Sequence, residues 1–208
     1  MLKVGLTGNY YSGQYEVGLL FEELDVPVFD ANLITKFLLN YSPKHRKEIN
    51  KQFGDTSFSM GVLNLSNFNS NIKFNKLLDI IELDLLKAYE KFRSLHRDAD
   101  YTIFKYDFIF ERMIENSFDY NISCYRPKRY RKTDMQTLTN FPQYIIDEIV
   151  KNEMDELTKN NKSNFVIQNY NTGTTYNSDI VIGLESQIRS LHKKIMLRKG
   201  DIISEHYY

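Results

Sequence analysis

Gly8 and Gly13 enclose four residues, the spacing of the phosphate-binding loop pattern G-x-x-x-x-G-K-[ST]. The next two positions depart from the pattern, because Gln14 stands where the lysine belongs and Tyr15 where the serine or threonine belongs. In such loops the lysine neutralises the β- and γ-phosphates and the hydroxyl holds Mg²⁺. The sequence therefore predicts a vestigial loop formed by these four residues, with no catalytic and no metal-binding group.

The segments around the loop read as the elements that would position it. Residues 2–6 are apolar and end at Thr7-Gly8, which is typical of a short buried strand. Beyond the loop, apolar residues recur at helical spacing from Val17 to Leu24, and residues 26–29 read as a second strand. Strand, glycine loop, helix and strand form a βαβ unit, for which a right-handed crossover is expected.

The rest of the chain continues the alternation of strands and helices. Further strands are predicted at 101–104, 120–124 and 164–168, and helices at 31–39, 72–93, 143–157 and from about 178 onward. Residues 54–71 are polar and aperiodic, so they read as a loop or insert. The prediction is a three-layer α/β fold with a five-stranded parallel sheet flanked by helices. We expect one domain over 1–208, with a helical or loop insert at about 40–98 and a lid-like segment at about 126–142.

Bulk composition excludes several classes of protein. The formal net charge of zero provides no global field for nucleic acid or membrane. Cys124 is the only cysteine, which excludes disulfide scaffolds and cysteine-based zinc sites, and the four histidines have no ligand spacing. No apolar run approaches 18 residues, and the N-terminus reads as a strand rather than a signal peptide. We therefore expect an intracellular protein that binds neither membrane nor nucleic acid.

Two segments near the N-terminus have longer patterns: residues 5–17 read GLTGNYYSGQYEV, and residues 27–32 read PVFDAN. They resemble dephospho-CoA kinase, the last enzyme of coenzyme A synthesis, whose members read G-L-T-G-G-I-G-S-G-K-S-T-V and V-I-D-A-D at these places. More weakly, residues 107–111 resemble P-L-L-F-E and residues 166–171 resemble V-I-D-N-N-G. The resemblance implies a P-loop nucleotide-kinase fold and, for an intact member, ATP-dependent phosphorylation of dephospho-CoA.

Departures from the family pattern fall mostly on polar positions. Beside Gln14 and Tyr15, Asn32 replaces the aspartate that the resemblance makes the base on the substrate hydroxyl, and an amide cannot accept that proton. The family's lid segment R-x-x-x-R-D keeps Arg131 but shows Met135-Gln136 for its last pair. Loss of one such group costs roughly 3 kcal/mol of transition-state stabilisation by analogy with an oxyanion donor, so we expect no efficient kinase.

A kinase fold that retains its core but lacks its catalytic residues favours a protein whose role is to bind other proteins through its surface. We expect a structural or assembly component of a larger homo- or hetero-oligomeric complex, with a phage virion as one candidate, and no cofactor. The 15 tyrosines and 14 phenylalanines suit protein interfaces. Two alternatives stay open: an active dephospho-CoA or nucleotide kinase with an atypical loop, and a regulator that binds a nucleotide or coenzyme A without turnover.

Two further groups of charged residues have competing interpretations. The basic run between Arg126 and Lys132 either contacts an anion or forms a solvated helix face or inter-subunit salt-bridge surface, and we favour the latter. Asp107 and Glu111 follow the third strand, where carboxylates could orient substrate or metal or could cap a helix.

Overall fold

The computed structural model describes residues 1–68, 70–139, 142–170 and 178–205. The chain divides into two compact units, one formed by Met1–Phe29 with His96–Tyr208 and the other by Asp30–Leu95. The glycine loop belongs to the first unit. Within the described part of the chain, no helix combines the length and apolarity needed to cross a membrane.

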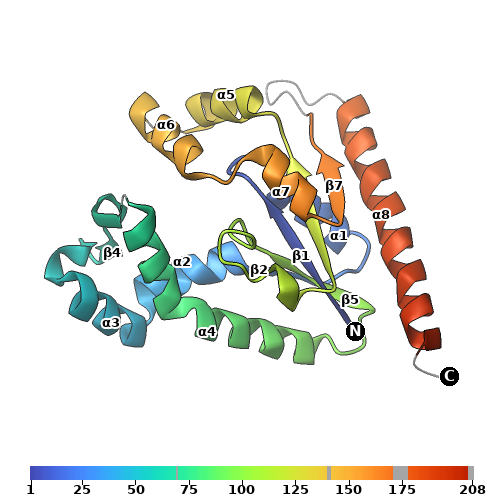
Figure 1. The fold of residues 1–208 in the computed structure, drawn as a ribbon, viewed down its shortest axis with the longest axis horizontal. Helices are drawn as coiled ribbons and strands as arrows, with labels where there is room; N and C mark the ends of the chain where they lie inside the picture. Colours follow the sequence, from blue (N-terminus) through green and yellow to red (C-terminus); the bar gives the residue numbers. More distant parts are fainter. Residues whose placement is uncertain (69, 140–141, 171–177, 206–208) are drawn as a thin grey trace. The chain divides into compact units, whose positions relative to one another are not determined.

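A five-stranded sheet organises the first unit (Figure 1). Its strands are β1 (Leu2–Gly8), β2 (Val28–Asp30), β5 (Tyr101–Lys105), β6 (Tyr120–Tyr125) and β7 (Phe165–Gln168), in the order β2-β5-β1-β6-β7. β1 lies between β5 and β6 and runs parallel to both, and Leu6 is opposite Lys105 on one side and Ile122 on the other. The predicted parallel α/β sheet is confirmed, and the loop leaves its central strand.

The first unit also contains helices, some of which pack on the strands. They are α1 (Gln14–Glu22), α5 (Lys128–Leu138), α6 (Gln143–Asn152), α7 (Glu156–Lys162) and α8 (Ser178–Glu205), with a 3₁₀ turn at Glu115–Ser117. α8 runs beside β7 (Figure 1) and packs with α1 over the strands. The main core contains Leu6 of β1, Phe21 of α1 and Ile188 of α8, each almost fully buried. Burial of such side chains supplies most of the driving force for this layer.

The prediction of a single helix over 143–157 was wrong. α6 ends at Asn152, and α7 begins at Glu156. Asp155 accepts a hydrogen bond from the backbone N–H of Thr158 at 3.0 Å and thereby caps a new helix. The break places Glu153 and Met154 in a short connector, where their polar groups can reach the glycine loop.

The second unit is mainly helical. It contains α2 (Ala31–Tyr41), α3 (Pro43–Phe53), α4 (Asn71–Leu95), 3₁₀ turns at Asp55–Ser57 and Leu65–Phe68, and a hairpin of β3 (Phe58–Ser59) and β4 (Val62–Leu63). Asp30 caps α2 by accepting from the Leu33 N–H at 3.0 Å, and Asn32 lies in the first turn of that helix. The polar stretch at 54–71 thus holds short ordered elements, which are too brief to show a periodicity in sequence.

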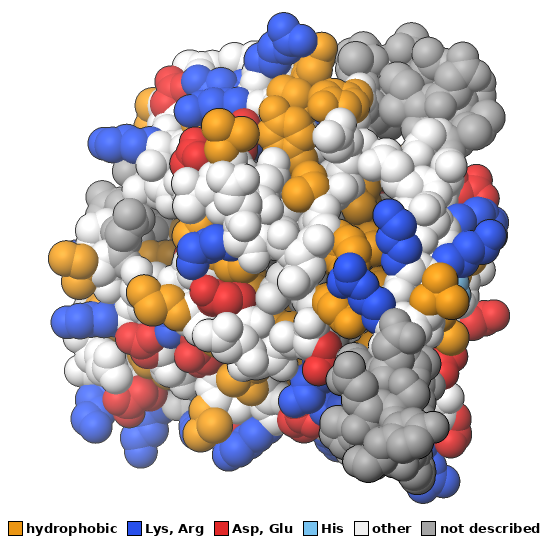
Figure 2. All heavy atoms as spheres, turned by 45° about the vertical axis from the view of Figure 1, so that its right-hand side comes forward, with side chains coloured by type: hydrophobic (Ala, Val, Ile, Leu, Met, Phe, Trp, Pro, Cys, Tyr) orange, Lys and Arg blue, Asp and Glu red, His pale blue; other side chains and the backbone are white. Residues whose placement is uncertain are grey.

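Charges of both signs lie over the face drawn in Figure 2, with apolar side chains between them. This mixture agrees with the zero formal net charge of the chain.

Candidate functional site

The glycine loop keeps a tight backbone turn between β1 and α1. The Ser12 N–H donates to the Asn9 carbonyl at 2.9 Å, and Tyr11 and Gly13 have left-handed φ values of 64° and 95°. A Cβ at Gly13 would collide with the side-chain amide of Asn169, which donates to the Ser12 carbonyl at 3.1 Å. Gly13 is therefore required both by its φ and by the close approach of Asn169.

Gln14 occupies the lysine position and turns its side chain inward, where it is buried. Its Oε1 accepts from the Ser12 hydroxyl at 2.9 Å, and its Nε2 donates to Asp107 Oδ1 at 3.1 Å. The amide is thus hydrogen-bonded at both ends within the protein. At this position the chain places a neutral group that ties the loop to the segment after β5.

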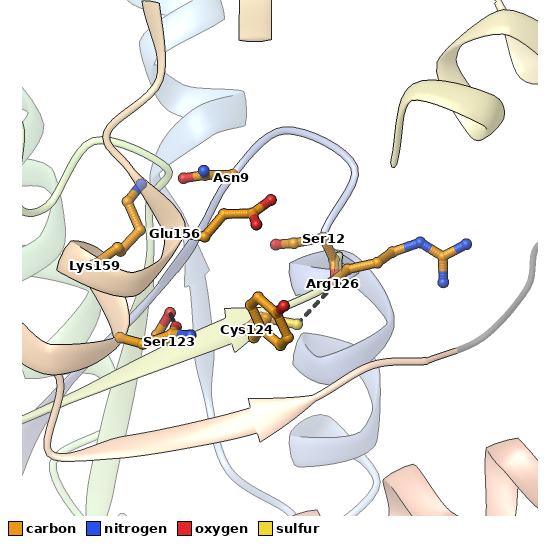
Figure 3. Close-up of a pocket in the computed structure, with 9 residues that line it drawn as sticks. Asn9, Ser12, Ser123, Cys124, Arg126, Glu156 and Lys159 are labelled. Atoms are coloured by element: carbon orange, nitrogen blue, oxygen red, sulfur yellow. Dashed lines mark hydrogen bonds between the residues drawn. The ribbon is translucent and has the colours of Figure 1, made fainter. Parts of the chain in front are cut away.

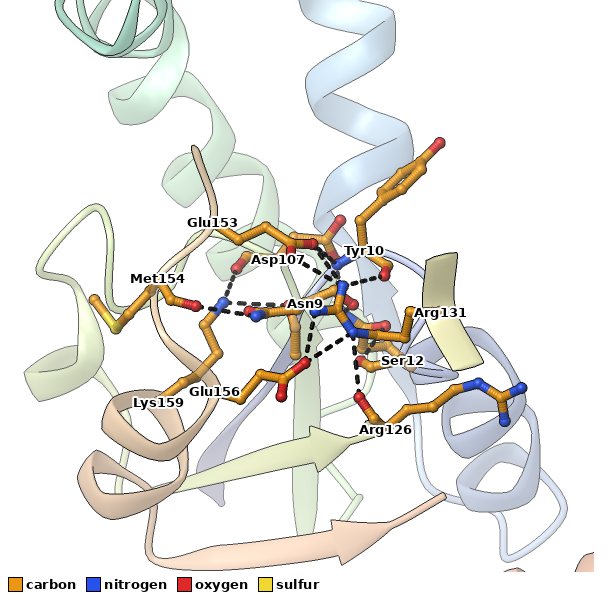
Figure 4. Close-up of polar contacts among 12 residues, drawn as sticks. Asn9, Tyr10, Ser12, Asp107, Arg126, Arg131, Glu153, Met154, Glu156 and Lys159 are labelled. Atoms are coloured by element: carbon orange, nitrogen blue, oxygen red, sulfur yellow. Dashed lines mark hydrogen bonds and ion pairs between the residues drawn. The ribbon is translucent and has the colours of Figure 1, made fainter. Parts of the chain in front are cut away.

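Lys159 of α7 brings a buried ammonium group beneath the loop (Figure 4). Its Nζ donates to the carbonyls of Gly8 at 3.2 Å and Asp107 at 3.0 Å, and it pairs with Glu111 Oε1 at 2.8 Å. An ammonium group has three donors, and these three oxygens use them all. Lys159 therefore holds the loop to the segment after β5, and its charge is already compensated.

Arg131 of α5 is the most deeply buried cation of the first unit's described residues, with 1% of its side chain exposed. Its guanidinium donates to both oxygens of Glu153 at 2.9 Å and to Glu156 Oε1 at 2.7 Å. It also donates to the backbone carbonyls of Tyr10 at 2.9 Å and Arg126 at 3.2 Å (Figure 4). This arginine clamps α5, the connector and the glycine loop together rather than facing a ligand.

Glu153 places a carboxylate directly on the glycine loop. Its Oε1 accepts from the Tyr10 N–H at 2.7 Å, while the Met154 carbonyl accepts from the Asn9 side-chain amide at 3.0 Å. Burial raises the pKa of Glu153 above its usual range, although Arg131 and the Tyr10 N–H act in the opposite direction. Loop N–H groups of this kind bind phosphate oxygens in intact P-loops, so Glu153 occupies an anion position.

The two loop tyrosines point in different directions. Their rings meet edge to face with centroids 5.0 Å apart. Tyr11 packs on the buried cluster of Met135, Ile146 and Val150 from α5 and α6, whereas the Tyr10 ring points away from the Arg131 guanidinium (Figure 4). Tyr11 therefore joins the loop to the apolar side of α5 and α6, and Met135 serves that packing.

A small hollow lies beside the loop (Figure 3). Its free volume of about 10 Å³ holds at most a single water. Asn9 lines it, and the Asn9 Oδ1 has no hydrogen-bond partner within the described chain, so a water there would satisfy it. Cys124 also lines it, donating through Sγ to the Ser12 carbonyl at 2.9 Å. The hollow is too small for a nucleotide.

Charged residues of the lid-like segment are largely paired within the chain. Arg126 pairs with the buried Asp134 at 2.6 Å, and Lys132 pairs with Asp147 at 2.6 Å. Together with Arg131, these contacts neutralise much of the basic run by intramolecular carboxylates. Lys128 and Arg129 remain exposed on α5, as a solvated helix face requires, and an anion contact at the paired cations would compete with these pairs.

A sequence model of dephospho-CoA kinase matches residues 2–174. The chain belongs to the dephospho-CoA kinase family. It is 22% identical over 191 residues to the dephospho-CoA kinase of Rickettsia felis, covering 92% of this chain and 96% of that relative. It is 24% identical over 173 residues to that of Bacteroides fragilis, covering 81% and 84%.

Solved structures show the same fold. TT1252 from Thermus thermophilus superposes with a TM-score of 0.72 at 16% identity, covering 93% of this chain and 97% of that one. Dephospho-CoA kinase from Campylobacter jejuni gives a TM-score of 0.53 at 14% identity, covering 93% and 96%. The resemblance drawn from the sequence and the P-loop kinase fold it implies are both confirmed.

Magnesium, which kinases of this fold use, does not fit the residues of this family member. The position of the metal-holding hydroxyl is taken by Tyr15, whose side chain is largely exposed. Asp107 Oδ1 accepts from Gln14 Nε2, and the described residues contain no group of three or more His, Cys, Asp or Glu side chains arranged to hold a metal. Mg²⁺ is usually bound through one or two carboxylates together with phosphates and waters. Here the loop lacks the serine or threonine hydroxyl, and one oxygen of the nearby Asp107 carboxylate is hydrogen-bonded to Gln14.

The sequence motif named the four loop residues but not Glu153 and Lys159, which the structure places against the loop. Glu153 was hidden because residues 143–157 read as one helix, and Lys159 lies just beyond that predicted helix. Neither residue stands at a recognised motif spacing. The Asp155 cap was the available signal for a break. Asp107 and Glu111, for which an orienting or capping role was considered, accept from Gln14 and Lys159 respectively.

Proposed function

We propose that this family member binds a phosphate-bearing ligand, a nucleotide or a coenzyme A-type molecule, at the glycine loop without transferring a phosphoryl group at ordinary kinase rates. The main support is the Gln14 side chain, which stands at the lysine position and is hydrogen-bonded to Ser12 and Asp107. The loop around it keeps its tight backbone turn. Backbone N–H groups at the start of α1 can still bind phosphate oxygens.

We expect phosphoryl transfer to be lost because the cations near the loop are already bound to groups of the protein. Phosphoryl transfer depends on positioning and on cations that stabilise the developing charge. Gln14 is neutral, Lys159 is saturated by three protein oxygens, and Arg131 is held by two carboxylates and two carbonyls. None of these groups can reach a γ-phosphate without breaking its existing contacts.

Phosphorylation of dephospho-CoA is the second candidate. It is favoured by the family match over residues 2–174 and by two relatives that carry that name. It requires that cations released from their present partners, or others near the loop, replace the missing lysine and metal ligand.

The expectation of a structural or assembly component, including a phage virion protein, rests on the lost charges alone. Neither the family match nor the fold adds support to it. A fixed stoichiometric complex on purification from the native source would favour it over both ligand-based candidates.

The deciding experiment measures binding and turnover on the same preparations. Calorimetry with ATP, ADP, coenzyme A and dephospho-CoA tests binding, and a coupled ADP-release assay with dephospho-CoA and Mg-ATP tests transfer. The variant Gln14→Lys with Tyr15→Ser restores the pattern, and Gln52→Lys on the exposed face of α3 is a matched control for added charge.

Saturable binding without turnover, in wild type and in Gln52→Lys, supports the proposal. Wild-type turnover near the ordinary kinase range of roughly 1–100 per second establishes the second candidate instead. Absence of both binding and turnover in wild type overturns both.

A further inference from the structure

Lys105 ends β5 at the edge of the sheet from which the glycine loop leaves. It is paired in register with Leu6 of β1, and only 6% of the residue is exposed. Its stem runs past Gly18 of α1, where a Cβ would lie 3.5 Å from the Lys105 Cδ. A Cβ there would make only ordinary van der Waals contact, so the Lys105 stem packs along α1 and its ammonium group reaches the first turn of that helix.

The Lys105 ammonium group lies next to the residue that replaces the metal-holding hydroxyl. Its Nζ is 5.0 Å from the centroid of the Tyr15 ring, within the range of a cation–π contact. In P-loop enzymes a P-loop hydroxyl and an aspartate hold Mg²⁺ beside the phosphates. Here a phenol ring and an ammonium group stand together at that side of the loop.

Two positive charges repel, so an ammonium group beside the position of the metal-holding hydroxyl disfavours a magnesium ion there, and it supplies no ligand for the metal. The same ammonium group is an effective partner for a phosphate, as a point charge with three donors. Gln14 has removed one cation from the start of α1, and Lys105 brings another from the neighbouring strand. Compared with an intact P-loop, the positive charge thus comes from the strand β5 instead of from the first residue of α1.

We infer that the loop binds phosphate groups without magnesium, and that Lys105 supplies the positive charge that the metal supplies in active kinases of this fold. The inference rests on the proposed function and specifies its cofactor requirement. The ligand class is a free polyphosphate group, such as that of a nucleoside diphosphate, rather than its magnesium complex.

Calorimetry of the full chain with ADP and with pyrophosphate, each in excess EDTA and in excess MgCl₂, tests this inference. Wild type should bind in EDTA at least as tightly as in MgCl₂, because magnesium neutralises the charge that Lys105 recognises. Lys105→Gln should weaken binding in EDTA by about tenfold or more, the scale of one charge-assisted hydrogen bond. Lys51→Gln, which removes an exposed charge on α3, should leave the affinity unchanged.

Binding of either ligand only when magnesium is present would overturn the inference and leave the proposed function standing. Equal loss of affinity in the Lys105 and Lys51 variants would also overturn it, since a general charge effect would then explain binding. Absence of binding to ADP and pyrophosphate in both buffers would overturn the inference. The same absence for ATP, coenzyme A and dephospho-CoA in the calorimetry described above would overturn the proposed function itself. The wild-type comparison decides the magnesium question even if Lys105→Gln does not fold.

Discussion

The Glu153 carboxylate lies 2.7 Å from the backbone nitrogen of Tyr10, so the connector between α6 and α7 places its own anion on the glycine loop. Arg131 fixes that carboxylate through both oxygens and also donates to the Tyr10 carbonyl. A phosphate that approaches the same N–H must displace Glu153 or bind farther along the loop, toward α1. The loop of this chain is thus held closed by contacts that motif reading does not reveal.

Glu153→Gln should change how stability depends on pH. Because the pKa of Glu153 is raised in the folded protein, its contribution to stability is fully present below the unfolded value near 4.5 and is lost as pH rises through the folded pKa. The free energy of unfolding of wild type relative to the glutamine variant should therefore increase as pH falls from about 7 to about 5. Urea denaturation of both proteins at matched pH measures this difference in the free energy of unfolding. Contributions from the other titrating groups are the same in both proteins and cancel. A difference that stays constant, or that grows with rising pH, would contradict the burial-dominated shift.

Arg131→Met should destabilise the first unit strongly. The change leaves the partly buried carboxylates of Glu153 and Glu156 without their cation, and breaking such a pair at a buried partner costs up to about 3–5 kcal/mol. Arg189→Met is the matched control, because Arg189 pairs with Glu185 on an exposed helix face and such pairs contribute about 0.3–0.5 kcal/mol. Denaturant midpoints at constant m-value provide the comparison. Similar losses in the two variants would show that the Arg131 contacts do not hold the loop as described.

Gly13→Ala should destabilise more than Gly61→Ala. Both glycines have left-handed φ values, 95° and 81°, so both substitutions incur a backbone penalty of roughly 1–2 kcal/mol. Only at Gly13 does a new Cβ also meet a neighbouring side chain, that of Asn169; Gly61 has open space around it. Thermal denaturation of the two variants separates the steric cost from the backbone cost. If the two melting temperatures fall equally, Asn169 must move aside freely, and its contact with the loop contributes little.

Cys124 should resist thiol reagents in the folded protein. Burial raises the pKa of its thiol to about 12, and its Sγ donates to the Ser12 carbonyl at 2.9 Å. Labelling with an aromatic disulfide reagent near neutral pH should therefore be very slow in buffer and complete in urea, because only the thiolate reacts. Stoichiometric labelling within seconds under native conditions would mean that β6 and the loop open far more readily than this burial implies.

Local sequence patterns were sufficient for the βαβ unit and the parallel sheet. The apolar run before Gly8, the helical spacing from Val17 and the glycine spacing each reflect short-range constraints on backbone and burial. The same patterns gave the replacement of lysine by Gln14 and of hydroxyl by Tyr15, since residue identity at a motif position needs no coordinates. They failed at residues 143–157, where the apolar periodicity is continuous but the helix is interrupted and Asp155 caps a new one.

What the chain alone determined is its family, its layered α/β fold and the absence of lysine and hydroxyl at two positions of the loop. What only the tertiary structure decided is where the remaining charges are directed. Lys105 ends β5, whereas Arg131, Glu153 and Lys159 come from the segment between β6 and β7. They lie near the loop because the carboxyl ends of β1, β5 and β6 stand at one edge of the sheet. Whether a charged side chain faces a ligand or a partner within the chain depends on those long-range contacts.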